Sequence, residues 1–302
     1  MQIPKETLAR FEKAGYRIVG NHSGVSICHW TKESLRTGRV CYKEQWYGIK
    51  SHRCLEMSPS IAWCNHQCRF CWRPFKCSAC GEPGSDEPAD IIDGCIEARK
   101  SLLTGFGGRD GTDRKKFEEA MKPTSAAISL AGEPTLYPRI GELIAEFNRR
   151  RMTSFLVTNG TMPDRLNSLS SEPTNLYVSL CAPDRETYLR VNRPLIKDGW
   201  ERLNRTLEIM RSFNCRKVLR LTLVKGLNMH SVEEYARLVN KASPDIIEPK
   251  GYSWVGDSRE RLGEENVPSM NEMRDFSSKL SELSGYRIEA ENEPSKVLLL
   301  KR

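Results

Sequence analysis

The stretch IAWCNHQCRFCWRP, residues 61–74, places three cysteines within eight positions. Cys64, Cys68 and Cys71 follow a C-x3-C-x2-C spacing, which lets one loop present all three thiols to a single metal centre. Iron–sulfur clusters are held by cysteine thiolates, and a four-iron cluster with three thiolates keeps one iron open. The spacing therefore predicts a four-iron cluster whose open iron binds a substrate or a cofactor.

A zinc ion is the alternative for the same thiols. A structural zinc site has four ligands, so it would need a distant fourth residue such as His66 or Cys77. The C-x3-C-x2-C loop is unusual for zinc, and we favour the cluster. A nearby C-x2-C pair, Cys77 and Cys80, supplies too few ligands for a closed zinc site, and we interpret it as two free thiols.

The composition is that of a globular protein. Of the 302 residues, 38% are hydrophobic and 28% charged, which argues against a disordered chain. No apolar run approaches the ~20 residues of a membrane span, and the N-terminus has no apolar signal-peptide core. We therefore expect a soluble, cytosolic protein with no membrane partner, whose eleven cysteines serve as metal ligands or packing residues rather than in disulfides. The net charge of +8 favours a polyanionic partner.

Short apolar runs rich in β-branched residues alternate with helical patterns along the middle of the chain. The expected strands are 58–63, 126–131, 153–158, 175–180, 217–224 and 245–251. Apolar residues recur at helical spacing in three segments, and a longer helix is expected at about 88–104. The recurring residues are Ile140, Leu143, Ile144 and Phe147 in 138–150, Trp200, Leu203, Leu207, Met210 and Phe213 in 199–213, and Val232, Tyr235, Leu238 and Val239 in 231–241. This alternation is typical of a parallel α/β sheet, and six units are too few for a complete barrel. The pattern suits either an open doubly wound sheet or a partial barrel.

The two ends of the chain do not follow this alternation. We expect an N-terminal extension over residues 1–57, the main α/β fold over 58–255 and a C-terminal extension over 256–302. The last of these should contain a helix at about 269–284, followed by one or two short strands, and pack on the main fold.

Polar residues follow several of the expected strands. The cysteine loop follows the first strand, Gly132 and Glu133 follow the second, Asn159 follows the third, and Ser179 lies near the end of the fourth. Glu248 lies in the sixth strand. In both architectures ligands bind at the carboxyl ends of the strands, so these residues are candidates for one site.

The cysteine loop, with Phe70 directly before its last cysteine, resembles that of the radical S-adenosylmethionine (SAM) superfamily. The resemblance implies a partial (β/α)6 TIM-like barrel in which SAM chelates the open iron and is cleaved to a 5′-deoxyadenosyl radical. It also implies that Gly132 and Glu133 contact the SAM amino group, that Asn159 and Ser179 make further SAM contacts, and that the backbone near Phe70 meets the adenine.

A second set of cysteines lies upstream. Cys28, Cys41 and Cys54 are separated by twelve residues each time, too widely for a short zinc loop but compatible with three corners of another cluster. Three unrelated buried thiols are the alternative, because free cysteine is often buried.

Seven ordered blocks between about residues 20 and 300 resemble the archaeal tRNA 4-demethylwyosine synthases of the wybutosine pathway. These blocks are CYKEQWYGIKSHRC, CRFCWRP, LAGEPTLYP, FLVTNGTMPD, NRPLIKDGWERL, LRLTLVKGLNM and DSRERL. The resemblance implies a radical SAM lyase that condenses 1-methylguanosine of tRNA-Phe, beside the anticodon, with two carbons of pyruvate. It also implies two [4Fe–4S] clusters, the second held by Cys28, Cys41 and Cys54. We further expect a separate ferredoxin- or flavodoxin-type electron donor and a monomeric enzyme.

Two lysines are candidates for binding pyruvate as a Schiff base. Lys43 lies two residues after Cys41, and Lys50 lies four residues before Cys54. A lysine amine forms such adducts with carbonyl compounds, and Lys43 is the preferred candidate. The alternatives are a phosphate-contacting or solvated lysine, and pyruvate chelated by the open iron of the second cluster.

Basic and aromatic residues near these blocks are candidates for contacts with tRNA. The basic ones are Arg53, Arg73, Arg190, Arg193 and Arg220. Each is a candidate for contact with tRNA or with a substrate carboxylate, and a structural ion pair is the alternative. Trp46, Tyr47 and Trp72 are candidates for stacking on a base or for core packing. Two other functions compete with the synthase: a radical SAM enzyme that activates a protein glycyl site, and a non-catalytic iron–sulfur or zinc protein that binds RNA.

Overall fold

The computed structural model describes residues 3–73, 81–108 and 110–302, so Cys77 and Cys80 lie outside the described residues. The described chain forms two compact units. The first contains the described residues of Met1–Cys64, Gly81–Val157 and Leu169–Thr174, and the second those of Asn65–Cys80, Thr158–Ser168 and Asn175–Arg302. The sequence-based division at residues 57 and 255 stays a prediction.

Within the described part of the chain, the first unit contains five strands in the order β1–β2–β3–β4–β5. β1 (Arg17–Val19), β2 (Ser23–Ser26) and β3 (Cys54–Ser58) pair antiparallel, whereas β3, β4 (Ser125–Ile128) and β5 (Thr153–Thr158) pair parallel. All four residues of β4 are buried, as expected of a parallel strand that is covered on both faces.

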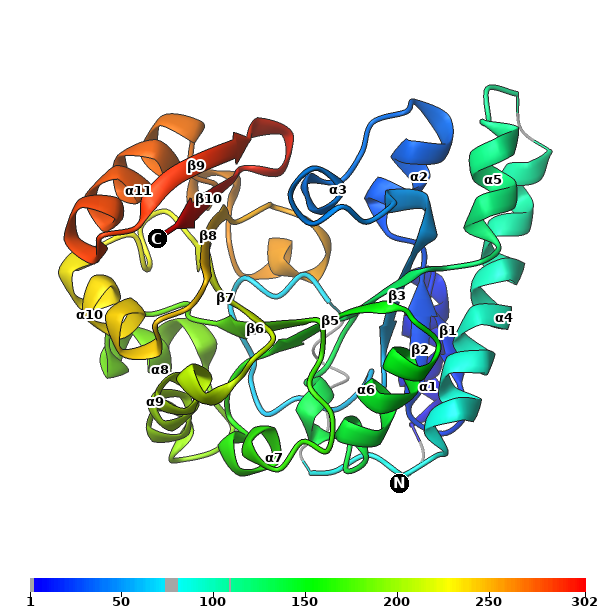
Figure 1. Ribbon diagram of the computed structural model, residues 1–302, viewed down its shortest axis with the longest axis horizontal. Coiled ribbons are helices and arrows are strands. Elements are labelled where there is room, and N and C mark those ends of the chain that lie inside the picture. The colour runs from blue at the N-terminus through cyan, green and yellow to red at the C-terminus, as the bar shows by residue number, and fades with distance from the viewer. Residues whose placement is uncertain (1–2, 74–80, 109) are drawn as a thin grey trace. The chain divides into compact units, whose positions relative to one another are not determined.

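Helices of the first unit connect and cover these strands. They are α1 (Lys5–Lys13), α2 (His29–Arg36), α3 (Tyr42–Tyr47), α4 (Pro88–Gly107), α5 (Arg114–Ala120) and α6 (Ile140–Arg149). The longest, α4, packs against β1 and β2 (Figure 1). The four apolar residues expected on one face of α6, which are Ile140, Leu143, Ile144 and Phe147, are all buried.

The second unit contains the other five strands. β6 (Asn175–Ser179), β7 (Arg216–Leu223) and β8 (Ile246–Gly251) pair parallel, and β10 (Val297–Lys301) pairs antiparallel with both β8 and β9 (Arg287–Asn292). Its helices are α7 (Pro163–Asn167), α8 (Arg185–Asn192), α9 (Gly199–Ile209), α10 (Val232–Ala242) and α11 (Met270–Ser284). α10 and α11 pack against each other (Figure 1).

The expected alternation of strands and helices is confirmed, with one strand misplaced. The strand predicted at 58–63 is wrong: the first parallel strand is β3, at Cys54–Ser58, and residues 59–62 form turns. Pro59 has no backbone N–H to continue the ladder, which explains why the strand ends before it. The shift places Cys54 at the start of β3. Within the described residues, no helix is both long and apolar enough to cross a bilayer.

Candidate active site and cluster ligands

The cysteine loop of the second unit is held by the end of α8. The backbone N–H of Gln67 donates to the carbonyl oxygens of Asn192 (3.2 Å) and Arg193 (3.1 Å). The N–H of Arg69 donates to the carbonyl oxygen of Val191 (2.9 Å). The loop has no regular secondary structure, so these bonds satisfy its backbone and fix its path.

The three thiols of the loop are divided between the units, with Cys64 in the first and Cys68 and Cys71 in the second. All three are half-buried. Burial raises the pKa of the Cys71 thiol, while the positive charges of Arg73 and Arg261 act in the opposite direction. A thiol that is neither inert in an apolar core nor fully exposed suits a cluster ligand.

His66, the alternative zinc ligand, lies between Tyr188 and Cys68 in the second unit. Its Nε2 lies 2.7 Å from the hydroxyl oxygen of Tyr188, and its Nδ1 lies 3.9 Å from the Cys68 sulfur. Burial lowers the pKa of His66 to about 3, so its ring is neutral at pH 7. The ring therefore supports the loop through Tyr188.

Gly132 and Glu133 form a turn that is bonded to the segment before Cys64. Gly132 has a φ of +71°, and a Cβ at this position would collide with the carbonyl oxygens of Ser60 and Trp63. The Glu133 N–H donates to the Trp63 carbonyl oxygen (2.7 Å), and the Ser60 hydroxyl donates to the Glu133 carbonyl oxygen (2.7 Å). Only glycine fits this close approach of two backbones.

The Glu133 carboxylate is buried and has a structural role. Its Oε1 accepts hydrogen bonds from the backbone N–H (3.0 Å) and the hydroxyl (2.6 Å) of Thr135. These bonds cap the 3₁₀ turn at Pro134–Leu136. The expected contact of Gly132 and Glu133 with SAM stays a prediction.

Asn159 is linked to the residue that starts the cysteine-loop segment of the second unit. Its Nδ2 donates to Oδ1 of Asn65 (2.7 Å), and Asn65 Nδ2 donates to the Thr161 hydroxyl (2.6 Å). Ser179 ends β6, where it pairs with Arg220 of β7. Phe70 packs against the small apolar cluster that contains Tyr252. Their expected contacts with SAM stay predictions.

Arg220 also illustrates a structural ion pair. Its guanidinium donates from Nε to Oε2 of the fully buried Glu248 (2.9 Å) and also from Nη2 to the same oxygen. The Tyr177 hydroxyl donates to the other oxygen of Glu248 (2.9 Å). The structure therefore favours the ion-pair role for Arg220 over a contact with tRNA.

The three upstream cysteines occupy similar positions in the first unit. Cys28 and Cys41 are the residues directly before α2 and α3, and Cys54 opens β3. The N–H of Lys43 points at the Cys41 sulfur (3.5 Å), and the N–H of Cys41 donates to the Ser51 hydroxyl (2.9 Å). The twelve-residue spacing thus arises because a short helix follows each of the first two cysteines.

These three thiols act on one another electrostatically. Burial raises the pKa of Cys28, and the negative charges of Glu56, Cys54 and Cys41 raise it further. Among the described residues, no three His, Cys, Asp or Glu side chains converge as they would around a single metal ion. Half-buried thiols whose negative charges act on one another as thiolates suit a cluster of several irons, which would supply the missing positive charge.

Lys43 and Lys50 lie in different surroundings. Lys43 is half-buried on α3, where its Nζ lies 4.3 Å from the ring centroid of Phe155 and its charge counteracts the raised pKa of Cys54. Lys50 is 62% exposed, with its Nζ 3.9 Å from the carboxylate of Glu44. Only Lys43 faces the upstream cysteines with an aromatic ring covering its amine.

A buried arginine that was not among the sequence-based candidates lies near these cysteines. Arg99 of α4 is 1% exposed, and its charge acts on both Cys54 and Cys28. A signal for it was present, because Ile92, Cys95 and Leu103 form an apolar stripe and Arg99 occupies a position within it. A charge on a buried stripe indicates a partner inside the protein.

Comparison with known proteins identifies the family. The model of the radical SAM superfamily matches residues 58–239, and a model for wyosine base formation matches residues 241–302. The S-adenosyl-L-methionine-dependent tRNA 4-demethylwyosine synthase of Pyrococcus horikoshii is 54% identical, over 99% of this chain and 90% of the relative. The chain belongs to the tRNA 4-demethylwyosine synthase family.

Solved structures agree with this membership. A structure of TYW1 with a lysine–pyruvate adduct bound is 35% identical, with a TM-score of 0.91, and the alignment covers 100% of this chain and 97% of that one. The crystal structure of archaeal TYW1 is 33% identical, with a TM-score of 0.83, covering 99% and 96%. The predicted fold class is confirmed, and a radical SAM synthase uses SAM and a [4Fe–4S] cluster. Membership decides against the glycyl-activating and non-catalytic alternatives.

Proposed function

We propose that this synthase condenses 1-methylguanosine of tRNA-Phe, beside the anticodon, with two carbons of pyruvate to form the tricyclic base 4-demethylwyosine. In this role it is a radical SAM lyase. The observation that carries the proposal is the 54% identity to the Pyrococcus horikoshii synthase over 99% of the chain. The two family models together extend from residue 58 to residue 302 and support it.

Lys43 is the residue proposed to bind pyruvate. Its Nζ attacks the ketone carbon of pyruvate, and loss of water leaves a Schiff base. The neighbouring Phe155 ring covers the amine on one side, and the TYW1 structure with a lysine–pyruvate adduct shows that such an adduct forms in a relative. The exposed position of Lys50, beside Glu44, makes it the weaker candidate. Pyruvate bound at an open iron of the second cluster is the remaining alternative.

The proposed cluster ligands are the two cysteine sets. Cys64, Cys68 and Cys71 would hold the cluster that binds SAM, and Cys28, Cys41 and Cys54 would hold a second [4Fe–4S] cluster. When bound, the first cluster and SAM supply the one-electron chemistry that takes hydrogen from an unactivated C–H bond. Within the chain, Gln67 and Arg69 hold the loop, and Gly132 lets the turn before Glu133 pass close to Ser60.

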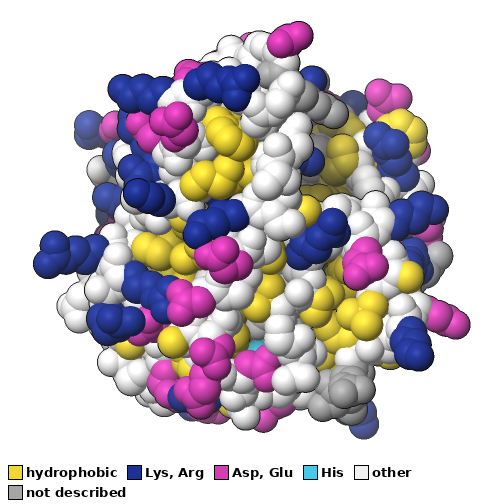
Figure 2. Space-filling model, turned by 90° about the vertical axis from the view of Figure 1, so that its right-hand side faces the viewer, with side chains coloured by type: hydrophobic (Ala, Val, Ile, Leu, Met, Phe, Trp, Pro, Cys, Tyr) yellow, Lys and Arg dark blue, Asp and Glu magenta, His cyan; other side chains and the backbone are white. Residues whose placement is uncertain are grey.

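The proposed SAM contacts are Phe70, Gly132, Glu133, Asn159 and Ser179. The proposed partners are tRNA-Phe, pyruvate and a separate electron donor of the ferredoxin or flavodoxin type, and the enzyme acts as a monomer in the cytosol. One face of the molecule has Lys and Arg side chains interspersed with Asp and Glu rather than gathered (Figure 2). Contacts with tRNA therefore have to be sought in local clusters of basic residues.

The test is a reconstituted reaction without oxygen. The chain is loaded with iron and sulfide, then incubated with reductant, SAM, pyruvate and tRNA-Phe that contains 1-methylguanosine, and the digested nucleosides are analysed by mass spectrometry. The tricyclic nucleoside should appear only when pyruvate and SAM are both present. Cleavage of SAM with 1-methylguanosine recovered intact would overturn the proposed reaction.

Iron content tests the number of clusters separately. Two four-iron clusters correspond to about eight irons per chain. Replacing Cys28, Cys41 and Cys54 together by alanine should leave about four. A wild-type chain that holds only four irons after full reconstitution would contradict the second cluster and leave the first untouched.

A further inference from the structure

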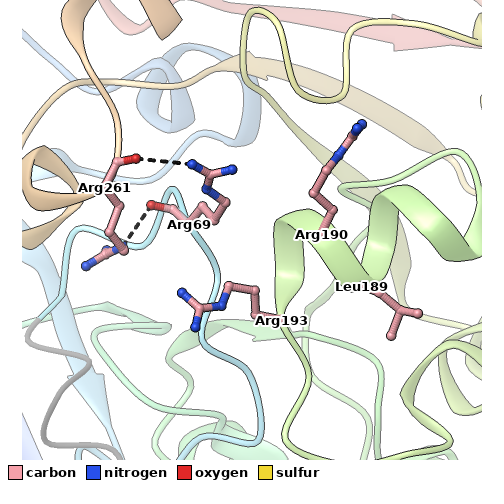
Figure 3. A pocket seen from close by; sticks show the side chains of 5 residues that line it. All are labelled: Arg69, Leu189, Arg190, Arg193 and Arg261. Atoms are coloured by element: carbon pink, nitrogen blue, oxygen red, sulfur yellow. Dashed lines mark hydrogen bonds between the residues drawn. The ribbon is translucent and has the colours of Figure 1, made fainter.

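The second unit contains a cavity of about 460 Å³ with an unusual lining. Four arginines and one leucine line it: Arg69, Arg190, Arg193, Arg261 and Leu189 (Figure 3). Among the described residues that line it, none is acidic. Like charges repel, so a pocket lined by four guanidinium groups is more favourable when it holds an anion.

The wall of this arginine pocket is part of the cysteine loop. Arg261 donates from Nε to the carbonyl oxygen of Arg69 (3.1 Å) and from Nη2 to the carbonyl oxygen of Cys71. Arg69 donates back to the carbonyl oxygen of Arg261 (3.5 Å), as the dashed lines in Figure 3 show. An anion in the pocket would therefore lie beside the loop that carries Cys68 and Cys71.

The opposite wall comes from α8 and the residue that ends it. Arg190 and Arg193 are exposed, and the Arg193 side chain points toward Arg69 (Figure 3). Arg193 has a φ of 48° and a ψ of 63°, in the left-handed region that costs ~1–2 kcal/mol for most residues. Glycine or asparagine would adopt this conformation more easily, so the strain draws attention to the Arg193 side chain.

Among the described residues, no ion pair joins Arg69, Arg190 or Arg193 to an acid, whereas Arg261 has acidic neighbours. These neighbours are the carboxylates of Asp257 and Glu260. Arg190 donates one hydrogen bond to the carbonyl oxygen of Leu227 (3.1 Å), which carries no charge. The pocket therefore retains positive charge at its open side.

We propose that the arginine pocket binds a backbone phosphate of the RNA substrate and so positions the RNA against the cysteine loop. This inference rests on the proposed function, because it assumes an RNA substrate. The forked donors of arginine match phosphate oxygens, and the pocket opens to the surface at Arg190 and Arg193, which a continuous phosphodiester chain requires. Contacts of this kind set position and register without reading bases.

Arg190 and Arg193 are the residues to change. Arg69 and Arg261 hold the cysteine-loop backbone, so their variants would disturb the cluster as well. We choose Arg190→Gln and Arg193→Asn, since asparagine tolerates the left-handed conformation. The matched control is Arg237→Gln on α10, which also removes an exposed charge, but one whose guanidinium is paired with Glu234.

The experiment measures binding of tRNA-Phe by the reconstituted protein between 50 and 200 mM salt, values chosen from the range in which such binding changes steeply. Each lost phosphate contact should weaken binding and lower the slope of log affinity against log salt by about 0.7–0.9. The double variant Arg190→Gln/Arg193→Asn should lose more, while Arg237→Gln keeps the wild-type slope. An unchanged slope in the double variant, with wild-type iron content, would overturn the proposal.

Competition with inorganic phosphate at constant ionic strength distinguishes a small-anion site from a site for RNA. If phosphate binds the wild type but not the double variant, and tRNA affinity is the same for both, the pocket takes free anions and the proposal is wrong.

Nucleoside analysis of the wild type distinguishes a failure of the pocket proposal from a failure of the proposed function. If the wild type makes the tricycle and the variants keep the wild-type slope of log affinity against log salt, the pocket proposal is wrong and the proposed reaction stands. If the wild type makes no tricycle but the double variant lowers the salt slope, the proposed reaction is wrong and the pocket stands.

Discussion

Arg99 donates from Nη2 to the carbonyl oxygen of His52 (2.6 Å), and this bond ties a buried guanidinium to the residue two positions before Cys54 in sequence. A second donor, Nη1, bonds the carbonyl oxygen of Ala120, and Nε has no acceptor among the described residues. Burial lowers the pKa of Arg99 to about 10, so the group remains charged at pH 7. Arg99 thus brings a positive charge to the thiols of Cys28 and Cys54.

Replacing Arg99 by methionine should lower the reduction potential of the proposed second cluster. A positive charge favours the reduced, more negative cluster, so its removal disfavours reduction. The variant should also lose roughly 2 kcal/mol of unfolding free energy, because a buried carbonyl without a donor costs about 1–3 kcal/mol. The potential is measured by redox titration with electron paramagnetic resonance, in a background with Cys64, Cys68 and Cys71 changed to alanine. Arg99→Lys is the control that keeps the charge, and equal potentials in wild type and Arg99→Met would refute the electrostatic role.

Lys43→Ala should cleave SAM yet form no tricyclic nucleoside, because the proposed Schiff base needs the Nζ amine. Lys50→Ala should keep both activities, since the Lys50 side chain is exposed beside Glu44. Borohydride treatment with pyruvate should add the reduced adduct to the wild type and to Lys50→Ala, as read by intact-protein mass spectrometry. A normal tricycle yield from Lys43→Ala would end the Schiff-base proposal and favour pyruvate bound at an iron.

Gly132→Ala should weaken SAM binding and destabilise the fold, because the new Cβ would push against the carbonyl oxygens of Ser60 and Trp63. Gly226→Ala is a matched control: its φ of 76° is nearly the same, but its Cβ would meet only Asn266 Nδ2 at 3.9 Å. Both variants carry the cost of a positive φ, so the difference between their losses of unfolding free energy gives the cost of the collision. We expect this cost to be ~1–3 kcal/mol. Urea unfolding and SAM titration measure the two effects. Equal loss of stability in both variants would mean that the turn tolerates the methyl group.

Arg220→Met should destabilise the second unit without changing the salt dependence of tRNA binding. Removing one partner of a buried ion pair typically costs ~3–5 kcal/mol, and Glu248 is fully buried. The double variant Arg220→Met/Glu248→Leu should recover much of this loss, because it leaves no unpaired buried charge. Thermal unfolding and the salt series used for Arg193 provide the measurements. If Arg220→Met lowers the slope of log tRNA affinity against log salt, Arg220 is again a candidate for tRNA contact.

Much of the fold could be predicted because its signals are local. The apolar stripe of α6 was found residue for residue, since helical spacing alone decides which side chains share a face. The first strand was misplaced because SPSIAW is as apolar as CLEMS, and only Pro59 marks the end of pairing. Trp200, expected on the buried face of α9, is half-buried, because the packing of neighbouring elements sets how deep a helix face lies.

The sequence by itself determined the family, the cysteine spacing and the alternation of strands and helices, because each is a pattern of residues close together along the chain. Only the tertiary structure decided that Lys43 faces Phe155 while Lys50 faces solvent, that Arg99 reaches the upstream thiols, and that four arginines meet in one pocket. Those outcomes depend on contacts between residues far apart in sequence, as with Arg69 and Arg261. Such contacts follow from packing, which local patterns do not encode.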